Sequence, residues 1–202
     1  GEISNEIPKR ALKDSDANSN IYTRPAKSYH QPIPDPGEPY QQVNTQLYNT
    51  ILPNEGPKSN INKSAAEMSQ PYNIPSPEPK KPGMNGFVND YINKLQVEKE
   101  HGELPTEEEF SVIMECFEPK KLPVLATLAK EFAVFDHWFC SVPSQTWCNR
   151  AFWHAGTSGG KVINPINIHD IENLDLEPQK QWEKSVWTKP TILSRLTEKK
   201  IP

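Results

Sequence analysis

Two hydroxyl side chains, Ser144 and Thr146, stand in a polar run that is the best candidate for chemistry in this chain. The run lies between an expected strand, residues 132–139, and an expected helix, residues 147–154. Ligands of open α/β sheets bind at the carboxyl ends of strands, and the N–H groups and dipole at a helix start favour an anion. The pattern therefore predicts an anion site, although Thr146 taken alone is more readily explained as an ordinary helix cap.

The elements that must position this run are visible in the apolar pattern. Residues 132–139 are dense in aromatic and β-branched side chains, which is typical of a buried strand in an α/β sheet. Residues 85–98 carry apolar side chains at helical spacing and predict an amphipathic helix. Thr106, followed three residues later by Glu109, predicts a capping box that starts another helix. Two more apolar stripes are expected to face the core: Phe110, Ile113, Met114 and Phe117, then Leu122, Leu125, Ala126, Leu128, Ala129 and Phe132.

Prolines are concentrated at the start of the chain, where residues 1–83 hold 13 of the 21. Proline fixes φ and lacks a backbone donor, so this density disfavours regular helices and sheets. Five tyrosines spaced along the same segment argue against full disorder. We therefore expect residues 1–83 to be an irregular, partly ordered segment, and residues 84–202 to be the helical and α/β part of the same domain. A flexible tail is the alternative for residues 1–20 and 54–82.

The composition excludes two classes of protein. Lys and Arg number 22 against 26 Asp and Glu, a net charge of −4, so a strongly basic nucleic-acid binder is excluded. No apolar stretch approaches the roughly 18 residues of a transmembrane helix. The three cysteines, Cys116, Cys140 and Cys148, lack metal-binding spacing. They are interpreted as buried free thiols, with a Cys140–Cys148 disulfide left open.

The run 141–150 reads SVPSQTWCNR and follows FDHWF at 135–139. Together they resemble the nucleophile segment of the phosphoesterase family, which includes non-specific and phosphatidylcholine-preferring phospholipases C and is related to a group of acid phosphatases. Further blocks resemble the family in the same order along the chain: PDPGE at 34–38, NTQLY at 44–48, MNGFV at 84–88 and AGTS at 155–158.

The resemblance implies an alkaline-phosphatase-like three-layer α/β/α sandwich with a divalent metal ion beside the nucleophile. It implies that Thr146 is both nucleophile and metal ligand, and that the Asn149 side-chain amide holds a phosphate oxygen. The expected reaction is hydrolysis of a phospholipid, or of another phosphate monoester or diester, through a phosphothreonine. A threonine hydroxyl is a weak nucleophile, and a metal ion both activates it and neutralises phosphoryl charge, so the chemistry agrees with these roles.

The chain also departs from the family pattern. Glu38 stands where many relatives carry His, and Arg150 can either clamp phosphate or support the fold. The family's early Glu-Asn block and late Asp-Glu-His block are not found, so we expect the remaining metal ligands outside this chain, truncation at both ends and no activity of the piece alone. Relatives are commonly exported or membrane-associated. The five histidines stay unassigned: His30, His101, His137, His154 and His169.

Two other functions remain open at this point. One is a non-catalytic interaction module that keeps the sandwich without the metal shell. The other, less favoured, is an acyl hydrolase using Ser144 or Cys148, which lack the G-x-S-x-G surroundings of a nucleophile elbow. Metal identity, head group and oligomeric state are not predicted.

Overall fold

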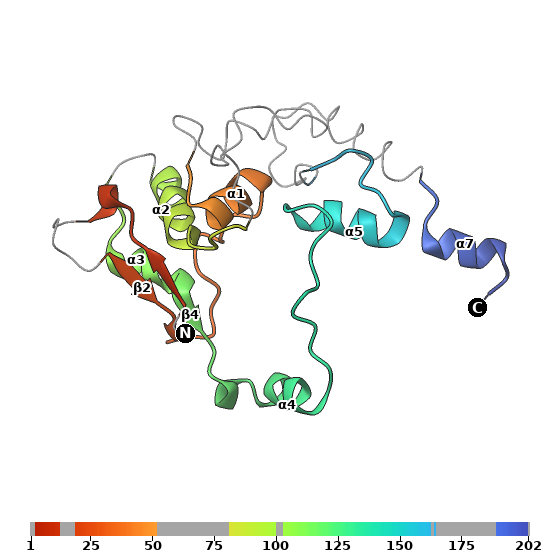
Figure 1. The fold of residues 1–202 in the computed structure, drawn as a ribbon, viewed down its shortest axis with the longest axis horizontal. Helices are drawn as coiled ribbons and strands as arrows, with labels where there is room; N and C mark the ends of the chain where they lie inside the picture. The colour runs from red at the N-terminus through yellow and green to blue at the C-terminus, as the bar shows by residue number, and fades with distance from the viewer. Residues whose placement is uncertain are drawn as a thin grey trace. The chain divides into compact units, whose positions relative to one another are not determined.

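The computed structural model describes residues 3–12, 19–51, 81–99, 103–162, 164 and 189–201. The chain divides into two compact units, Gly1–Gly37 with Asn44–Gly56 and Asn73–Phe139, and Glu38–Val43 with Pro57–Tyr72 and Cys140–Pro202. The elements follow in this order (Figure 1): β1 (Ser4–Glu6), η1 (Lys9–Ala11), β2 (Asn20–Tyr22), β3 (Arg24–Pro25), α1 (Tyr40–Tyr48), α2 (Phe87–Glu98), α3 (Glu107–Ser111), η2 (Val112–Met114), β4 (Glu115–Cys116), η3 (Pro119–Lys121), α4 (Pro123–Glu131), α5 (Thr146–Ala155) and α7 (Ile192–Glu198).

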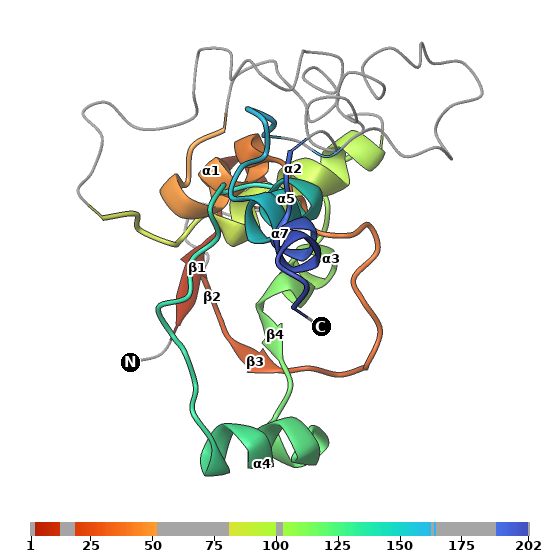
Figure 2. The same ribbon diagram turned by 90° about the vertical axis from the view of Figure 1, so that its right-hand side faces the viewer.

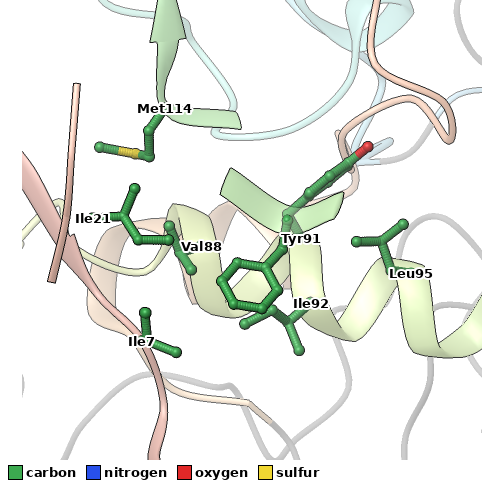
Figure 3. Packing of buried hydrophobic residues seen from close by; sticks show 8 residues of the cluster. Ile7, Ile21, Val88, Tyr91, Ile92, Leu95 and Met114 are labelled. Carbon is green, nitrogen blue, oxygen red and sulfur yellow. The ribbon is translucent and has the colours of Figure 1, made fainter. Parts of the chain in front are cut away.

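Helix α2 is the centre of the first unit, and it confirms the helix predicted over residues 85–98. Its apolar side chains pack with Ile7, which follows β1, with Ile21 of β2 and with Met114 of η2, as Figure 3 shows. Burial of these aliphatic and aromatic groups is the main stabilising contribution in this unit. The core cluster consists of Ile7, Ile21, Val88, Tyr91, Ile92, Leu95, Phe110 and Met114.

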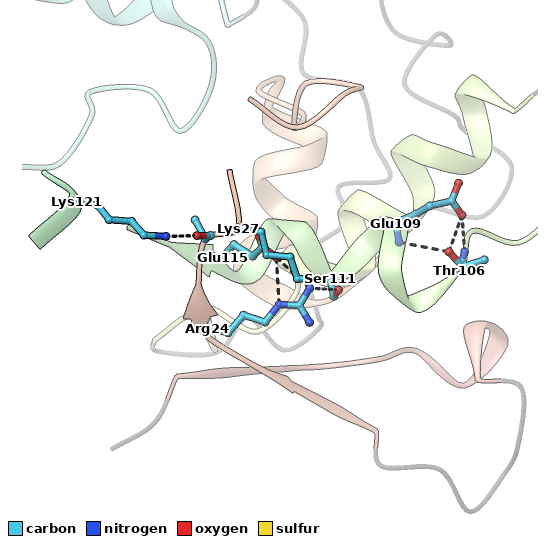
Figure 4. Close-up of polar contacts among 8 residues, drawn as sticks. Arg24, Lys27, Thr106, Glu109, Ser111, Glu115 and Lys121 are labelled. Atoms are coloured by element: carbon cyan, nitrogen blue, oxygen red, sulfur yellow. Dashed lines mark hydrogen bonds and ion pairs between the residues drawn. The ribbon is translucent and has the colours of Figure 1, made fainter. Parts of the chain in front are cut away.

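Two short strand pairs accompany this core (Figure 2). Strands β1 and β2 are antiparallel, and β3 and β4 are parallel. The second pair is reinforced by Arg24, whose Nη2 donates to Ser111 Oγ at 2.7 Å and lies 3.1 Å from Glu115 Oε1 (Figure 4). Lys121 Nζ also donates to the Ala26 carbonyl oxygen at 2.6 Å. Side-chain bonds therefore supply much of the stabilisation of the β3–β4 pair, which is only two residues long.

The predicted capping box begins α3, because Thr106 Oγ1 accepts from the Glu109 N–H while Glu109 accepts from the Thr106 N–H. The helix ends sooner than its apolar stripe suggested. After Ser111 the backbone tightens into η2 and then extends to pair with β3. Phe117 therefore lies beyond the helix and is exposed, stacked on Tyr29 with ring centroids 5.2 Å apart, so its expected core position is wrong.

The strand expected over residues 132–139 is wrong. This segment pairs with no strand in the described part of the chain, and Phe135, Trp138 and Phe139 are 69–77% exposed. The preceding helix α4 likewise turns its apolar stripe outward, so the core position expected for Leu125 and Leu128 is also wrong. A buried strand needs neighbouring strands to bond its backbone and cover both faces, and the described residues provide none there.

The mixture of helices and small sheets is consistent with the predicted α/β class. The described part of the segment 1–83 contains β1, β2, β3 and α1, and much of its proline-rich remainder lies outside the described residues. The division at residue 83 stays a prediction. No helix among the described residues has the length and apolar character needed to cross a membrane.

Candidate functional site

Helix α5 starts at Thr146, one residue before the predicted start. Its N-cap residue is Gln145, in extended conformation, and its last turn closes at Gly156 with a φ of 71°, which glycine adopts without strain. Thr146 is thus the first helical residue, so the ordinary-cap interpretation of its hydroxyl is wrong. The Thr146 side chain is exposed, and within the described residues its hydroxyl makes no hydrogen bond.

The Asn149 side chain lies one turn further along α5 and bonds back to the polar run before the helix. Its Oδ1 accepts from the Val142 N–H at 3.0 Å. Its Nδ2 reaches the carbonyl oxygens of Val142, Ser144 and Gln145 at 2.9, 3.2 and 3.1 Å. The amide expected to meet a phosphate oxygen is therefore occupied by backbone groups of the turn 142–145.

The same turn also bonds to Val162 and Asn164. Ser144 Oγ donates to the Val162 carbonyl oxygen. Gln145 Oε1 accepts from the Asn164 N–H, and Asn164 Oδ1 accepts from the Trp147 N–H, each at 2.8 Å. Asn164 thus satisfies a first-turn donor of α5 that no residue preceding the helix caps.

None of the three cysteines is in a disulfide, so the Cys140–Cys148 disulfide left open by the sequence is not formed. Cys148 on α5 is buried, and burial raises the pKa of its thiol to about 11. A thiol with that pKa is almost entirely protonated at neutral pH and is a poor nucleophile. Cys140 is exposed, so the prediction of a buried thiol fails for this residue, as it does for the exposed Cys116.

A divalent metal ion needs several oxygen or nitrogen ligands around one point. Among the described residues, no three His, Cys, Asp or Glu side chains lie close enough together to hold one. Thr146 offers a single hydroxyl ligand, which does not make a complete site. The other candidates do not join it: Glu38, Arg150, His30, His137 and His154 are exposed, and His101 and His169 lie outside the described residues.

A second polar cluster lies in the first unit, where three of the family-like blocks meet. Gln46 Nε2 donates to the Gly37 carbonyl oxygen and to Asp90 Oδ2, both at 2.9 Å. The N–H groups of Met84 and Gly86 donate to carbonyl oxygens of the 44–48 block. A Cβ on Gly86 would lie 1.8 Å from the Thr45 carbonyl oxygen, so this close approach requires glycine.

Asp90 is 2% exposed, and burial raises the pKa of its carboxyl to about 7, against smaller lowering effects of the Gln46 hydrogen bond and Lys94. The apolar pattern did not predict the burial of this carboxyl, because Asp90 lies off the apolar stripe of α2. Asn5 and Asn164 were also missed. Each caps a helix from a distant segment, Asn5 accepting from the Phe87 N–H at 2.7 Å, and no local motif marks such a cap.

Comparison with known proteins agrees with the resemblance in the sequence. The model of the phosphoesterase family matches residues 14–202. Non-specific phospholipase C3 of Arabidopsis thaliana is 34% identical over 170 residues, which are 83% of this chain and 26% of that protein. Non-specific phospholipase C4 of the same plant is 31% identical over 134 residues, 65% of this chain and 19% of that protein. The chain thus spans about a quarter or less of these relatives, and it belongs to the phosphoesterase family.

Proposed function

We propose that the protein hydrolyses phosphoester bonds in the manner of a phospholipase C, with Thr146 as its nucleophile. The observation that carries the proposal is the state of the Thr146 hydroxyl, which is exposed at the first position of α5 and has no capping role there. Family membership and the names of the relatives support the reaction class. The substrates proposed are phospholipids or other phosphate monoesters and diesters.

In the proposed reaction, Thr146 Oγ1 attacks phosphorus while the bond from phosphorus to the leaving alcohol oxygen breaks. The hydroxyl proton passes to a base or to water, and the departing alkoxide takes up a proton. Water then cleaves the phosphothreonine and regenerates the hydroxyl. The start of α5 favours the negative charge of the phosphoryl group through its dipole and first N–H groups.

A divalent metal ion, if bound at Thr146, would supply nucleophile activation and charge neutralisation. The described residues do not complete its shell. We propose that the other ligands come from the family's early Glu-Asn and late Asp-Glu-His blocks, which are not found in these 202 residues, and that the catalytic domain is an alkaline-phosphatase-like three-layer α/β/α sandwich. The 202 residues alone should then show little or no turnover.

The test is a Thr146→Val variant of the longest natural form of the protein. Valine keeps the branched shape and removes only the attacking oxygen. We expect the initial rate on phosphatidylcholine micelles with added divalent metal to fall by at least about 10⁴-fold, as for loss of other nucleophiles. Thr197→Val is the control for removal of a hydroxyl, because Thr197 is also exposed but lies on α7, where its Oγ1 donates to the Leu193 carbonyl oxygen.

Near-normal turnover by Thr146→Val would exclude Thr146 as the nucleophile. Absence of any turnover by the unaltered full-length protein, across phospholipids and a chromogenic phosphate ester, would favour the non-catalytic interaction module. Robust metal-dependent turnover by the 202-residue chain would contradict the proposal that its metal ligands lie elsewhere.

A further inference from the structure

The bonds of Asn149 use both donor hydrogens of its amide and one of the two lone pairs of its Oδ1. Oδ1 accepts from the Val142 N–H, and Nδ2, which has two hydrogens, is shared among the carbonyl oxygens of Val142, Ser144 and Gln145. A phosphate oxygen could bind Nδ2 only by displacing at least one of these carbonyls. Both donor hydrogens of the Asn149 amide are therefore already hydrogen-bonded to the protein in the absence of a ligand.

These bonds hold the backbone of residues 142–145, which directly precede Thr146 and therefore determine its position. The turn 142–145 contains Pro143 and has no strand or helix to hold its backbone. Asn149 closes this turn onto the first turn of α5, and Thr146 follows directly after it. A displacement of a reacting group by about 1 Å is enough to lower a rate about a hundredfold. Hydrogen bonds that fix this turn therefore matter for an attacking hydroxyl.

Contacts of Val162 and Asn164 restrain the turn independently of Asn149. Gln145 Oε1 accepts from the Asn164 N–H, and Asn164 Oδ1 accepts from the N–H of Trp147, two residues after Gln145, each at 2.8 Å. Ser144 bonds to Val162 beside them. The turn is thus hydrogen-bonded both by Asn149 and by Val162 and Asn164, while the Thr146 side chain stays exposed. This arrangement can hold the Thr146 hydroxyl in one position.

We propose that Asn149 is a positioning residue, which fixes the turn 142–145 and through it the place of Thr146 Oγ1, and that it does not bind the phosphate itself. The kinetic part of this inference rests on the proposed function. The structural part, that the conformation of the turn depends on Asn149, can be tested even if the protein has no activity.

The structural half is tested by amide hydrogen exchange in the ligand-free, full-length protein. In Asn149→Ala, exchange of the Val142 N–H should accelerate at least tenfold, because its acceptor is removed. In Asn149→Asp, exchange at Val142 should also accelerate, because a carboxylate oxygen replaces the Nδ2 donor and repels the three carbonyl oxygens. His154→Gln is the control, since His154 is exposed in the last turn of the same helix. Unchanged exchange at Val142 in Asn149→Ala would overturn the proposal.

The kinetic half separates positioning from direct contact, at equal amounts of folded protein. Positioning predicts that both variants lower kcat at least tenfold, while KM and the inhibition constant of inorganic phosphate change less than threefold. Direct contact predicts weaker phosphate inhibition in both variants, and much weaker in Asn149→Asp, because the new carboxylate would repel the anion. That pattern would overturn the proposal. Normal turnover by Thr146→Val would instead refute the proposed function, and Val142 exchange would still decide whether Asn149 holds the turn.

Discussion

Asp90 gives the sharpest quantitative prediction, because a carboxylate is buried in α2 with only partial compensation. One hydrogen bond from Gln46 and the charge of Lys94 oppose its desolvation, yet the pKa of the carboxyl rises from 3.8 to about 7. The folded protein therefore binds this proton more tightly than the unfolded chain does. Asp90 adds stability as pH falls through 7 toward 4, and its charged form lowers stability above pH 7.

The change to test is Asp90→Asn, which removes the titration and still offers Gln46 an oxygen acceptor. At pH 5, two units below the folded pKa, the wild type gains about 3 kcal/mol of unfolding free energy relative to its value at pH 8. The variant lacks this gain. The difference in unfolding free energy between variant and wild type should therefore shift in favour of the wild type by about 3 kcal/mol between pH 8 and pH 5.

Urea unfolding followed by far-ultraviolet circular dichroism at the two pH values measures this difference. Glu131→Gln serves as the control, because Glu131 is an exposed carboxylate at the end of α4. Its difference from the wild type should be the same at pH 8 and pH 5. If Asp90→Asn also shows the same difference at both, the Asp90 carboxyl does not titrate near neutral pH and the reasoning from burial is refuted.

Two further predictions concern the packing around α2. Gly86→Ala should destabilise the protein by more than about 2 kcal/mol in thermal unfolding, because its Cβ would collide with the backbone oxygen of Thr45. Gly83→Ala is the control and should be nearly neutral, because its Cβ would meet only the flexible side chain of Asn85. Asn5→Ala should lose about 1–2 kcal/mol in urea unfolding, because buried N–H groups at the start of α2 lose their acceptor, and Asn5→Asp should recover most of that loss.

Local signals in the sequence predicted local structure well. The 3.6-residue apolar period located α2, the Thr106–Glu109 spacing located the start of α3, and the polar run located the start of α5. Each depends on side chains within one or two turns of each other. Such interactions need nothing from the rest of the chain, so a pattern in the sequence is enough to identify them.

Features that depend on distant segments were predicted poorly. The apolar run 132–139 has the composition of a buried strand, but composition does not supply the neighbours that a strand needs. The caps by Asn5 and Asn164, and the burial of Asp90 against Gln46, join residues far apart in the sequence. The position of Thr146 was predicted, whereas the backbone bonds of Asn149 came only from the three-dimensional arrangement.

The family-like blocks of the two units differ in what their residues bond to. In the first unit, Gln46 bridges the 34–38 loop and Asp90, and Gly86 admits the backbone of the 44–48 block. These contacts join backbone to backbone or bury a carboxyl. In the block 141–150, by contrast, the side chains of Ser144, Gln145 and Asn149 bond to backbone groups in and beside the turn, and the Thr146 hydroxyl does not. Asn164 alone already accepts from the Trp147 N–H at the start of α5, so under the proposed function these bonds are better explained by a need to hold Thr146 in place than by a need to start the helix.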